Sequence, residues 1–407
     1  MTSKKVLLLS PFFFPEQIST GRYNSFLAEA LVSAGCDISV IASHPIYPNW
    51  RAEISNATLP GIEIIRGGGW FAYPRSPILR RATLESWYAW HVLVNFFRLG
   101  SRPDIVISIF PPSLFFMILN VFMSRVICRV GIVHDLQGVY ASKSSSPIGR
   151  ILNGAIHFVE KRCFRACNSL IFLSASMAKR AIAEYQLDFN RCKVCYPFVA
   201  IPEDMGGVAL AGVLLGNNFN VVYSGALGEK QNPDGIFAFM NEITDIQAKV
   251  TCHIFSSGPI FDQLRAANAK SLNCNVQFHD LVPTEQLAEL YARSDVQIIP
   301  QALNTSEGSL PSKLPNLLSA GVPVFVICEK GSELGNLVNQ AKAGMVVHTW
   351  DTAELVGQFR FYKNELAAES KQDRRMRLQT FVKSKFSIDC VVENVLAVAK
   401  NKREGDR

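Results

Sequence analysis

The stretch VLLLSPFFFPEQISTGRYNSFLAEALVSAGCDISVIAS, residues 6–43, holds two short apolar runs separated by a loop and a helical pattern. The runs VLLLS and DISVIAS are largely apolar, which is typical of strands that both faces of a parallel sheet bury. The helical pattern between them runs from near Arg22 to Ala34 and stops at Gly35, a common residue at a helix end. The stretch therefore predicts a strand–helix–strand unit of an α/β fold.

The same alternation recurs along the chain, pauses in a Gly- and Pro-containing stretch near residues 200–215, and then restarts. Further apolar runs that we expect to be strands lie at 104–110, 129–135, 169–174, 193–199, 220–227, 250–259, 275–282 and 295–300. A chain of 407 residues is long enough for two domains. We therefore predict an α/β protein of two doubly wound, Rossmann-like parallel-sheet domains that face each other across a cleft. The expected parts are residues 1–203, residues 204–385, and a C-terminal helix and tail at 386–407 that pack back toward the first domain.

Charge is distributed unevenly between the two halves. Residues 1–203 contain 21 Lys and Arg against 12 Asp and Glu, so the formal net charge of +7 lies entirely in this half. A basic half indicates an anionic partner such as nucleic acid, anionic lipid or a phosphorylated substrate, although solvated helix faces explain it as well. With 48% hydrophobic and 18% charged residues, the composition indicates a globular protein and not a disordered one.

Two segments bear on membrane association. Residues 105–124 carry no charge and are long enough to span a bilayer, but Pro111 and Pro112 divide them, so a strand, a turn and a helix are the better interpretation. The basic and aromatic stretch at 75–102 fits either a helix on a membrane surface or an ordinary amphipathic helix.

The ten cysteines, without a secretory signal, predict free thiols in a reducing cytosol. A lone C-x-x-C at 192–195 has no second pair and no nearby histidine, so we predict no zinc site there.

Two glycine-bearing turns in the second half follow predicted strands. In SGALGEK (224–230), Gly225 and Gly228 let the backbone approach a ligand closely and Lys230 supplies a charge. In SEGSLPSKLPNLL (306–318), small polar residues and Lys313 precede an apolar helical run, where free backbone N–H groups favour an anion. Either turn alone fits an ordinary surface loop, but the two together favour a site for a diphosphate.

At this point the motifs themselves resemble those of a known family. The stretches YSGALGEKQNPDGIFAF (223–239) and LPSKLPNLLSAGVPVFVICEKGSELGNLV (310–338), followed by AGMVV (343–347), are similar to the retaining glycosyltransferase family 4 of GT-B fold. Bacterial surface-polysaccharide members are the most alike. The N-terminal half agrees through PE-x-x-S-T-G-R-Y (15–23) and VHDLQG (133–138), so the resemblance covers nearly the whole chain.

The resemblance implies roles for individual residues. It implies that the donor diphosphate and nucleotide contact Gly21, Gly225, Lys230, His279, Ser309, Leu310, Pro311, Ser312, Lys313 and Asn316. The residues that we expect to take part in catalysis are His134, Lys230 and Glu307. Arg22, Tyr23 and His44 are candidate acceptor contacts, although Arg22 and Tyr23 fit a solvated helix face and His44 a strand cap equally well.

The chain also departs from the family pattern. The family has two glutamates with seven residues between them; here the second falls at Asn316 and the first at Gly308, with Glu307 one position away. The family's arginine in the first glycine turn is Ala226 here. Because no Asp-X-Asp occurs, we expect a site without a metal or a cofactor, in which lysines and helix N-termini neutralise the diphosphate of a UDP- or GDP-sugar.

We therefore predict a cytoplasmic hexosyltransferase that extends a lipid-linked glycan for a surface polysaccharide such as an exopolysaccharide, capsule or O-antigen. The basic half suits peripheral association with the anionic inner face of the membrane, and no nucleic acid partner is expected. The alternatives are a nucleotide-sugar epimerase or hydrolase of the same fold, and an inactive nucleotide-sugar-binding protein. A dinucleotide-dependent oxidoreductase is disfavoured because no G-x-G-x-x-G follows the first strand.

Overall fold

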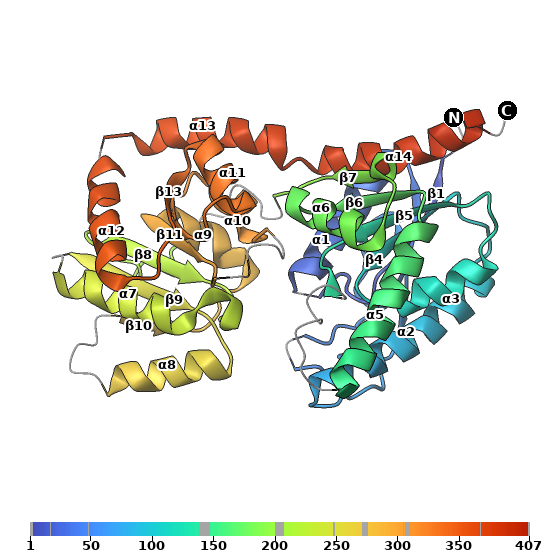
Figure 1. Cartoon of the computed structure of the whole chain (residues 1–407), viewed down its shortest axis with the longest axis horizontal. Helices are drawn as coiled ribbons and strands as arrows, with labels where there is room; N and C mark the ends of the chain where they lie inside the picture. The colour runs from blue at the N-terminus through green and yellow to red at the C-terminus, as the bar shows by residue number, and fades with distance from the viewer. Residues whose placement is uncertain are drawn as a thin grey trace. The chain divides into compact units, whose positions relative to one another are not determined.

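The computed structural model divides the chain into two compact units, Met1–Pro197 with Ser387–Arg407, and Phe198–Phe386. Each is described here by itself (Figure 1). The residues that the structure describes are 3–16, 18–47, 49–137, 147–199, 207–246, 249–270, 276–303, 305, 310–366 and 368–405. The domain boundary expected between residues 203 and 204 lies outside them.

The first unit is built on a seven-stranded sheet in the order β3-β2-β1-β4-β5-β6-β7, in which all neighbouring strands run parallel. Its strands are β1 (Lys5–Leu9), β2 (Asp37–Ser43), β3 (Ile62–Gly67), β4 (Ile105–Phe110), β5 (Cys128–Val133), β6 (Ser169–Phe172) and β7 (Cys192–Val194). All six residues of β4 are buried, as expected for a strand covered on both faces. The direction of strand addition reverses between β1 and β4, and ligands of such sheets bind beyond the carboxyl ends of the strands at this point.

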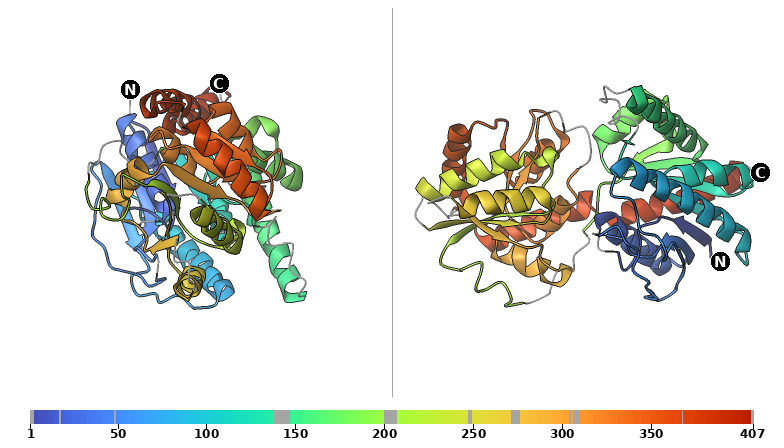
Figure 2. Two further views of the ribbon diagram at one scale, coloured as in Figure 1. Left: turned by 90° about the vertical axis from the view of Figure 1, so that its left-hand side faces the viewer. Right: turned by 90° about the horizontal axis from the view of Figure 1, so that it is seen from below.

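Helices cover both faces of this sheet (Figures 1 and 2). They are α1 (Ser19–Ser33), α2 (Pro77–Arg98), α3 (Leu114–Phe122), α5 (Pro147–Ala166), α6 (Ala175–Tyr185) and α14 (Ile388–Gly405), with a short 3-10 turn at Phe189–Arg191. On one face, α2, α3, α5 and α6 share a core with the strands that includes Tyr88, Phe116 and Phe164. The last helix, α14, packs against α1, β5 and β6.

One sequence prediction was wrong in this unit. Not all thiols are free: Cys195 and Cys390 form a disulfide. The other seven cysteines in the described part of the chain are free and buried. The pairing escaped prediction because 195 residues separate the two cysteines, and only the return of α14 to the first unit brings them together.

The second unit contains a six-stranded parallel sheet in the order β10-β9-β8-β11-β12-β13. Its strands are β8 (Phe219–Ser224), β9 (Val250–Phe255), β10 (Val276–His279), β11 (Val296–Pro300), β12 (Val324–Ile327) and β13 (Gly344–Val347). Its helices are α7 (Pro233–Ile246), α8 (Pro259–Ala269), α9 (Leu287–Arg293), α10 (Lys313–Ser319), α11 (Glu333–Ala341), α12 (Thr352–Leu366) and α13 (Lys371–Lys385), with 3-10 turns at Glu229–Gln231 and Thr284–Gln286. The helices α7, α8 and α12 share its core with the strands.

The segment at 105–124 forms a strand, a turn and a helix, as predicted: β4 ends at Phe110 and α3 begins at Leu114. Across the described ranges, no helix has both the length and the apolar character needed to cross a bilayer.

Candidate active site

The turn at 224–230 and the described part of the stretch 306–318, from Leu310 onward, lie together in the second unit. Strand order reverses between β8 and β11, so the loops after these neighbouring strands meet at one edge of the sheet. The backbone links them directly, since the N–H of Ala302, after β11, donates to the carbonyl oxygen of Lys230, after β8, at 2.8 Å. A lysine-bearing turn therefore lies at the place where this kind of sheet binds ligands.

Gly225 gives this turn its open backbone. Its φ of +133° is a conformation that L side chains rarely adopt, and a Cβ placed there would meet no atom within 4 Å. The turn continues into the 3-10 segment Glu229–Gln231, where the side chain of Gln231 accepts from the N–H of Gly228 at 3.0 Å. Lys230 is exposed on this segment. The turn thus combines approachable backbone with a solvent-facing cation.

Lys313 is turned inward, beneath the Gly225 turn. Its Nζ donates to the carbonyl oxygens of Ser224 at 3.3 Å and Ile298 at 3.1 Å, and lies 4.5 Å from the centre of the Tyr223 ring. Burial lowers the pKa of Lys313 to about 7. The lysine therefore ties the end of β8 to β11, and a bound anion nearby would raise its pKa and favour its charged form.

The rest of the expected diphosphate stretch is only partly described. Leu310 is buried, Pro311 is half-buried and Ser312 is exposed. The Asn316 side chain donates to the carbonyl oxygen of Ser312 at 3.4 Å. Glu307 and Ser309, like Gly308, lie outside the described residues.

An aromatic pair stands at the ends of β9 and β10 in the same unit. The rings of Phe255 and His279 are stacked with centroids 4.5 Å apart, and the N–H of Gly225 donates to the carbonyl oxygen of Phe255 at 3.0 Å. His279 Nε2 lies 3.2 Å from Nδ1 of the buried His253, a residue that the sequence analysis did not select. Burial and the neighbouring His279 lower the pKa of His253 to about 3, and burial also lowers the pKa of His279. Both imidazoles are therefore neutral near pH 7. Phe255 is buried and His279 is half-buried, so in this stack the ring of His279 is the one that solvent reaches, next to the Gly225 turn.

In the first unit, His134 follows β5, and its N–H donates to the carbonyl oxygen of Phe110 at 2.8 Å. Its ring meets the ring of Tyr23 edge-on, with centroids 4.8 Å apart. Burial lowers the pKa of His134 to about 4, so the imidazole is neutral near pH 7. Its Nε2 is buried and has no hydrogen-bond partner among the described residues. A neutral imidazole with an unused nitrogen suits hydrogen bonding to a hydroxyl group of a ligand.

Tyr23, expected at the acceptor, is buried, and its position against the ring of His134 makes it a positioning residue. Arg22 is half-buried at the start of α1. Gly21 lies close to the loop after β1, where a Cβ would come within 2.8 Å of the carbonyl oxygen of Glu16. The structure therefore gives Gly21 a packing role, whatever else it contacts.

Glu16, which the sequence analysis did not select, joins two loops at the carboxyl edge of the first sheet. Its buried carboxylate accepts from the N–H groups of Ile46 at 2.8 Å and Tyr47 at 3.3 Å. His44 lies in the same region, and its Nδ1 accepts from the N–H of Ser55 at 3.1 Å. In the described structure, His44 therefore anchors the loop after β2 through this hydrogen bond.

Comparisons with known proteins agree with this architecture. Residues 20–201 match the model of Glycosyltransferase Family 4, and residues 218–361 match that of Glycosyl transferases group 1. The chain is 24% identical over 355 residues to the colanic acid biosynthesis glycosyl transferase WcaI of Escherichia coli (strain K12), which covers 82% of this chain and 85% of that protein.

Two solved structures show the same fold. Sucrose-phosphate synthase from Thermosynechococcus elongatus superposes with a TM-score of 0.68 at 16% identity over 98% of both chains. WaaG, a glycosyltransferase involved in lipopolysaccharide biosynthesis, has a TM-score of 0.68 at 12% identity over 96% of this chain and 99% of that one.

Two parallel-sheet units with these structural neighbours define the GT-B fold, and the two family models define a glycosyltransferase. The chain belongs to glycosyltransferase family 4, as the resemblance of its motifs implied.

Proposed function

We propose that this enzyme transfers a hexose from UDP- or GDP-sugar, with retention of configuration, to a lipid-linked glycan during synthesis of a bacterial surface polysaccharide. The observation that carries the proposal is the turn at Gly225 and Lys230, which lies where the strand order of the second sheet reverses. The name of the E. coli relative, a colanic acid biosynthesis enzyme, supports the polysaccharide pathway.

Breaking the bond between sugar and phosphate builds negative charge on the departing diphosphate. In this proposal, Lys230 and the backbone N–H groups near Gly225 stabilise that charge, because preorganised donors act most strongly where charge develops. Lys313, with its pKa of about 7, gains a proton when the diphosphate binds above it. These groups require neither a metal nor a cofactor, and the departing phosphate oxygen deprotonates the acceptor.

Each unit contributes one further group to this scheme: His134 in the first unit, and His279 stacked on Phe255 in the second. The unpartnered Nε2 of His134 hydrogen-bonds a hydroxyl group of the transferred sugar, and the neutral ring avoids placing a second positive charge beside the oxocarbenium-like transition state. The half-buried ring of His279, with the buried Phe255 stacked against it, supports the nucleotide base by stacking. Glu307 remains a candidate catalytic residue. The enzyme works in the cytoplasm, at the inner membrane surface.

Calorimetric titration with UDP and with GDP tests the donor site. We expect one nucleotide to bind with micromolar affinity, and Lys230→Ala to weaken that binding at least tenfold. Lys383→Ala is the matched control, because Lys383 is an exposed lysine on α13 of the same unit. Unchanged binding in Lys230→Ala would remove the proposed diphosphate contact.

Turnover then separates the proposed reaction from its alternatives. A transferase should release nucleotide from the radiolabelled donor only when a membrane extract is added, and the labelled sugar should then be recovered in the extract. Full-rate breakdown or epimerisation of the donor alone would favour the hydrolase or epimerase reading. Nucleotide binding without turnover of any donor tested would favour an inactive binding protein.

A further inference from the structure

Three helices of the first unit, α2, α3 and α5, present large apolar side chains to solvent. On α2, Trp90 and Phe97 are 68% and 64% exposed and lie seven residues apart, hence on one side of the helix. On α3, Val121 and Phe122 are 77% and 53% exposed. On α5, Phe158 is 52% exposed. Side chains of this size cost free energy when water surrounds them, so their concentration on one group of helices indicates a partner.

These side chains form a continuous face. The helix α2 packs against α3, and α3 against α5. The ring of Phe97 meets that of Phe122 with centroids 5.7 Å apart, which joins the apolar residues of α2 to those of α3.

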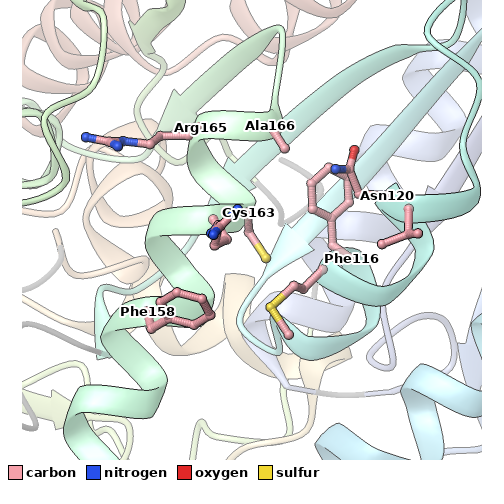
Figure 3. A pocket seen from close by; sticks show the side chains of 9 residues that line it. Phe116, Asn120, Phe158, Cys163, Arg165 and Ala166 are labelled. Carbon is pink, nitrogen blue, oxygen red and sulfur yellow. The ribbon is translucent and has the colours of Figure 1, made fainter.

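Next to them, a groove of about 460 Å³ opens between α3 and α5 (Figure 3). Phe116, Met117 and Val121 line it from α3, and Phe158 and Ala166 from α5. Its polar lining includes Asn120, Arg162 and Arg165.

The charged side chains that α2 and α5 expose to solvent are basic. The basic residues are Arg80, Arg81 and Arg98 on α2, and Arg150, Lys161, Arg162 and Arg165 on α5. The sequence of α3 contains no carboxylate, and α2 and α5 contain one each.

Both of those carboxylates have partners within the first unit, and that of Glu85 also lies 3.8 Å from the Arg81 guanidinium. Glu85 accepts from the N–H groups of Ser113 at 3.0 Å and Leu114 at 2.8 Å, where it caps α3. Glu160 is 1% exposed and accepts from the hydroxyl of Tyr185 and the N–H of Gln137. The face is therefore apolar and basic, without an exposed acid on any of the three helices.

We propose that this face, formed by α2, α3 and α5, docks on an anionic phospholipid bilayer, and that the groove takes one anionic phospholipid. Basic residues around exposed aromatic side chains complement a negatively charged interface, where each Lys or Arg near the surface adds to binding. A second copy of the chain fits this face poorly, because pairing it with itself would bring like charges together. The proposal deepens the membrane part of the proposed function but does not depend on the donor site.

In this proposal the apolar lining of the groove contacts the acyl chain of the lipid, and the polar lining contacts its headgroup. Met117 and Phe158 contact the acyl chain, and Arg162 contacts the phosphate. The Arg162 guanidinium lies 5.3 Å from the centre of the Phe158 ring, which places the cation at the boundary between the apolar and polar parts. Arg165 is held by the structure, since its Nε donates to the carbonyl oxygen of Tyr185 at 3.1 Å.

The test is co-sedimentation of the full chain with vesicles of phosphatidylcholine alone or with phosphatidylglycerol added. We expect binding to the phosphatidylglycerol vesicles that weakens with salt, and at least tenfold weaker binding to phosphatidylcholine. The variant Phe158→Ser/Arg162→Glu should lose at least tenfold in affinity for the anionic vesicles. The matched control is Phe361→Ser/Arg360→Glu, which changes an exposed phenylalanine and an exposed arginine of α12 and should bind like the wild type.

Depth of insertion provides a second measurement. Lipids brominated on the acyl chain should quench tryptophan fluorescence, and Trp90→Phe should remove most of that quenching. Absence of wild-type binding to anionic vesicles, or equal losses in both double variants, would overturn the proposal. A dimer in sedimentation velocity that the Phe158→Ser/Arg162→Glu variant abolishes, without vesicle binding, would assign the face to a second copy. Titration with UDP and GDP on the same proteins reports separately on the donor site.

Discussion

At the scale of single residues, His134 is a group whose burial makes the stability of the fold depend on pH. Burial lowers its pKa from 6.5 to about 4. Below pH 6.5 the unfolded chain binds a proton that the folded chain does not accept until about pH 4, so stability present above pH 6.5 is lost as the pH falls through this window. Each pKa unit corresponds to about 1.4 kcal/mol.

We therefore expect His134→Gln to flatten this pH dependence. Between pH 6.5 and 4.5 the free energy of unfolding of the wild type should fall by about 2 kcal/mol more than that of the variant. Urea denaturation at several pH values measures the difference, and above pH 7 the two curves should run parallel. Equal losses in the two proteins on acidification would show that the imidazole is accessible to protons in the folded state.

Lys313 has the same relation to pH as His134 but in a higher pH range, because burial again disfavours the charged form, which is the one present at low pH. Its pKa falls from 10.5 to about 7 on burial, so the folded state binds fewer protons between these values and stability rises with pH. Between pH 7 and pH 9 the wild type should gain about 2 kcal/mol relative to Lys313→Met. Lys383→Met on α13 is the control and should follow the wild type. A Lys313→Met protein with the wild-type slope would contradict the inward position of this side chain.

At the scale of elements, Gly21 determines how closely α1 approaches the loop after β1. A Cβ at this position would lie 2.8 Å from the backbone oxygen of Glu16, and backbone cannot move aside as a flexible side chain can. We expect Gly21→Ala to destabilise the protein by about 1–3 kcal/mol, the cost of an overpacked contact.

Gly154→Ala is the matched control, since Gly154 lies in α5 and a Cβ there would meet nothing within 4 Å. Alanine is the better helix former, so this variant should be more stable by about 0.5–1 kcal/mol. Thermal unfolding of both variants measures the contrast. If the two changed stability in the same direction, the contact with Glu16 would not govern the position of α1.

The sequence predicts most strands of both sheets correctly, because a strand buried on both faces must be apolar nearly throughout. That the two glycine turns belong to one site stays a prediction: the loops after β8 and β11 meet at the same sheet edge, and residues 306–309 lie outside the described part of the chain. The strand β3 escaped prediction: in IEIIRG only Ile62 is fully buried, so this edge strand lacks the continuous apolar signal of the central ones. Periodicity therefore finds the middle of a sheet more readily than its edge.

The sequence motifs did not predict in which direction the side chains point. A lysine at the start of a helix reads as a ligand for phosphate, yet Lys313 donates to two backbone carbonyls of its own unit. Tyr23 reads as a surface residue of α1 but is buried against His134. Glu16 stands in the motif at 15–23 but its role there was not predicted, and His253 carries no local signal, because their partners come from loops and strands distant in sequence. Such contacts depend on tertiary packing and need the folded coordinates.

At the scale of the whole molecule, the chain crosses from the first unit to the second and then returns. After Phe386 it re-enters the first unit as α14, which packs on α1 and on the strands β5 and β6. The first unit is therefore complete only when the last helix has been added to it. The disulfide between Cys195 and Cys390 joins this helix to the segment at which the chain leaves the unit.

This covalent link should stabilise the docking of α14. Closing a loop of nearly two hundred residues restricts the unfolded chain, and disulfides typically contribute about 2–4 kcal/mol in this way. We expect Cys390→Ser to lower the stability of the first unit by that amount, and to speed hydrogen exchange of the α14 amides more than that of the amides in α7, which belongs to the second unit.

The wild type treated with dithiothreitol should behave like Cys390→Ser, because reduction removes the same bond. The variant itself should not respond to the reductant. The control Cys252→Ser changes a buried free thiol of the second unit, so it should leave the reductant response of α14 intact whatever it costs in packing. Exchange of α14 that is insensitive both to reduction and to Cys390→Ser would mean that packing against α1 and β5 alone secures the helix, and that the disulfide adds nothing to the stability of the unit.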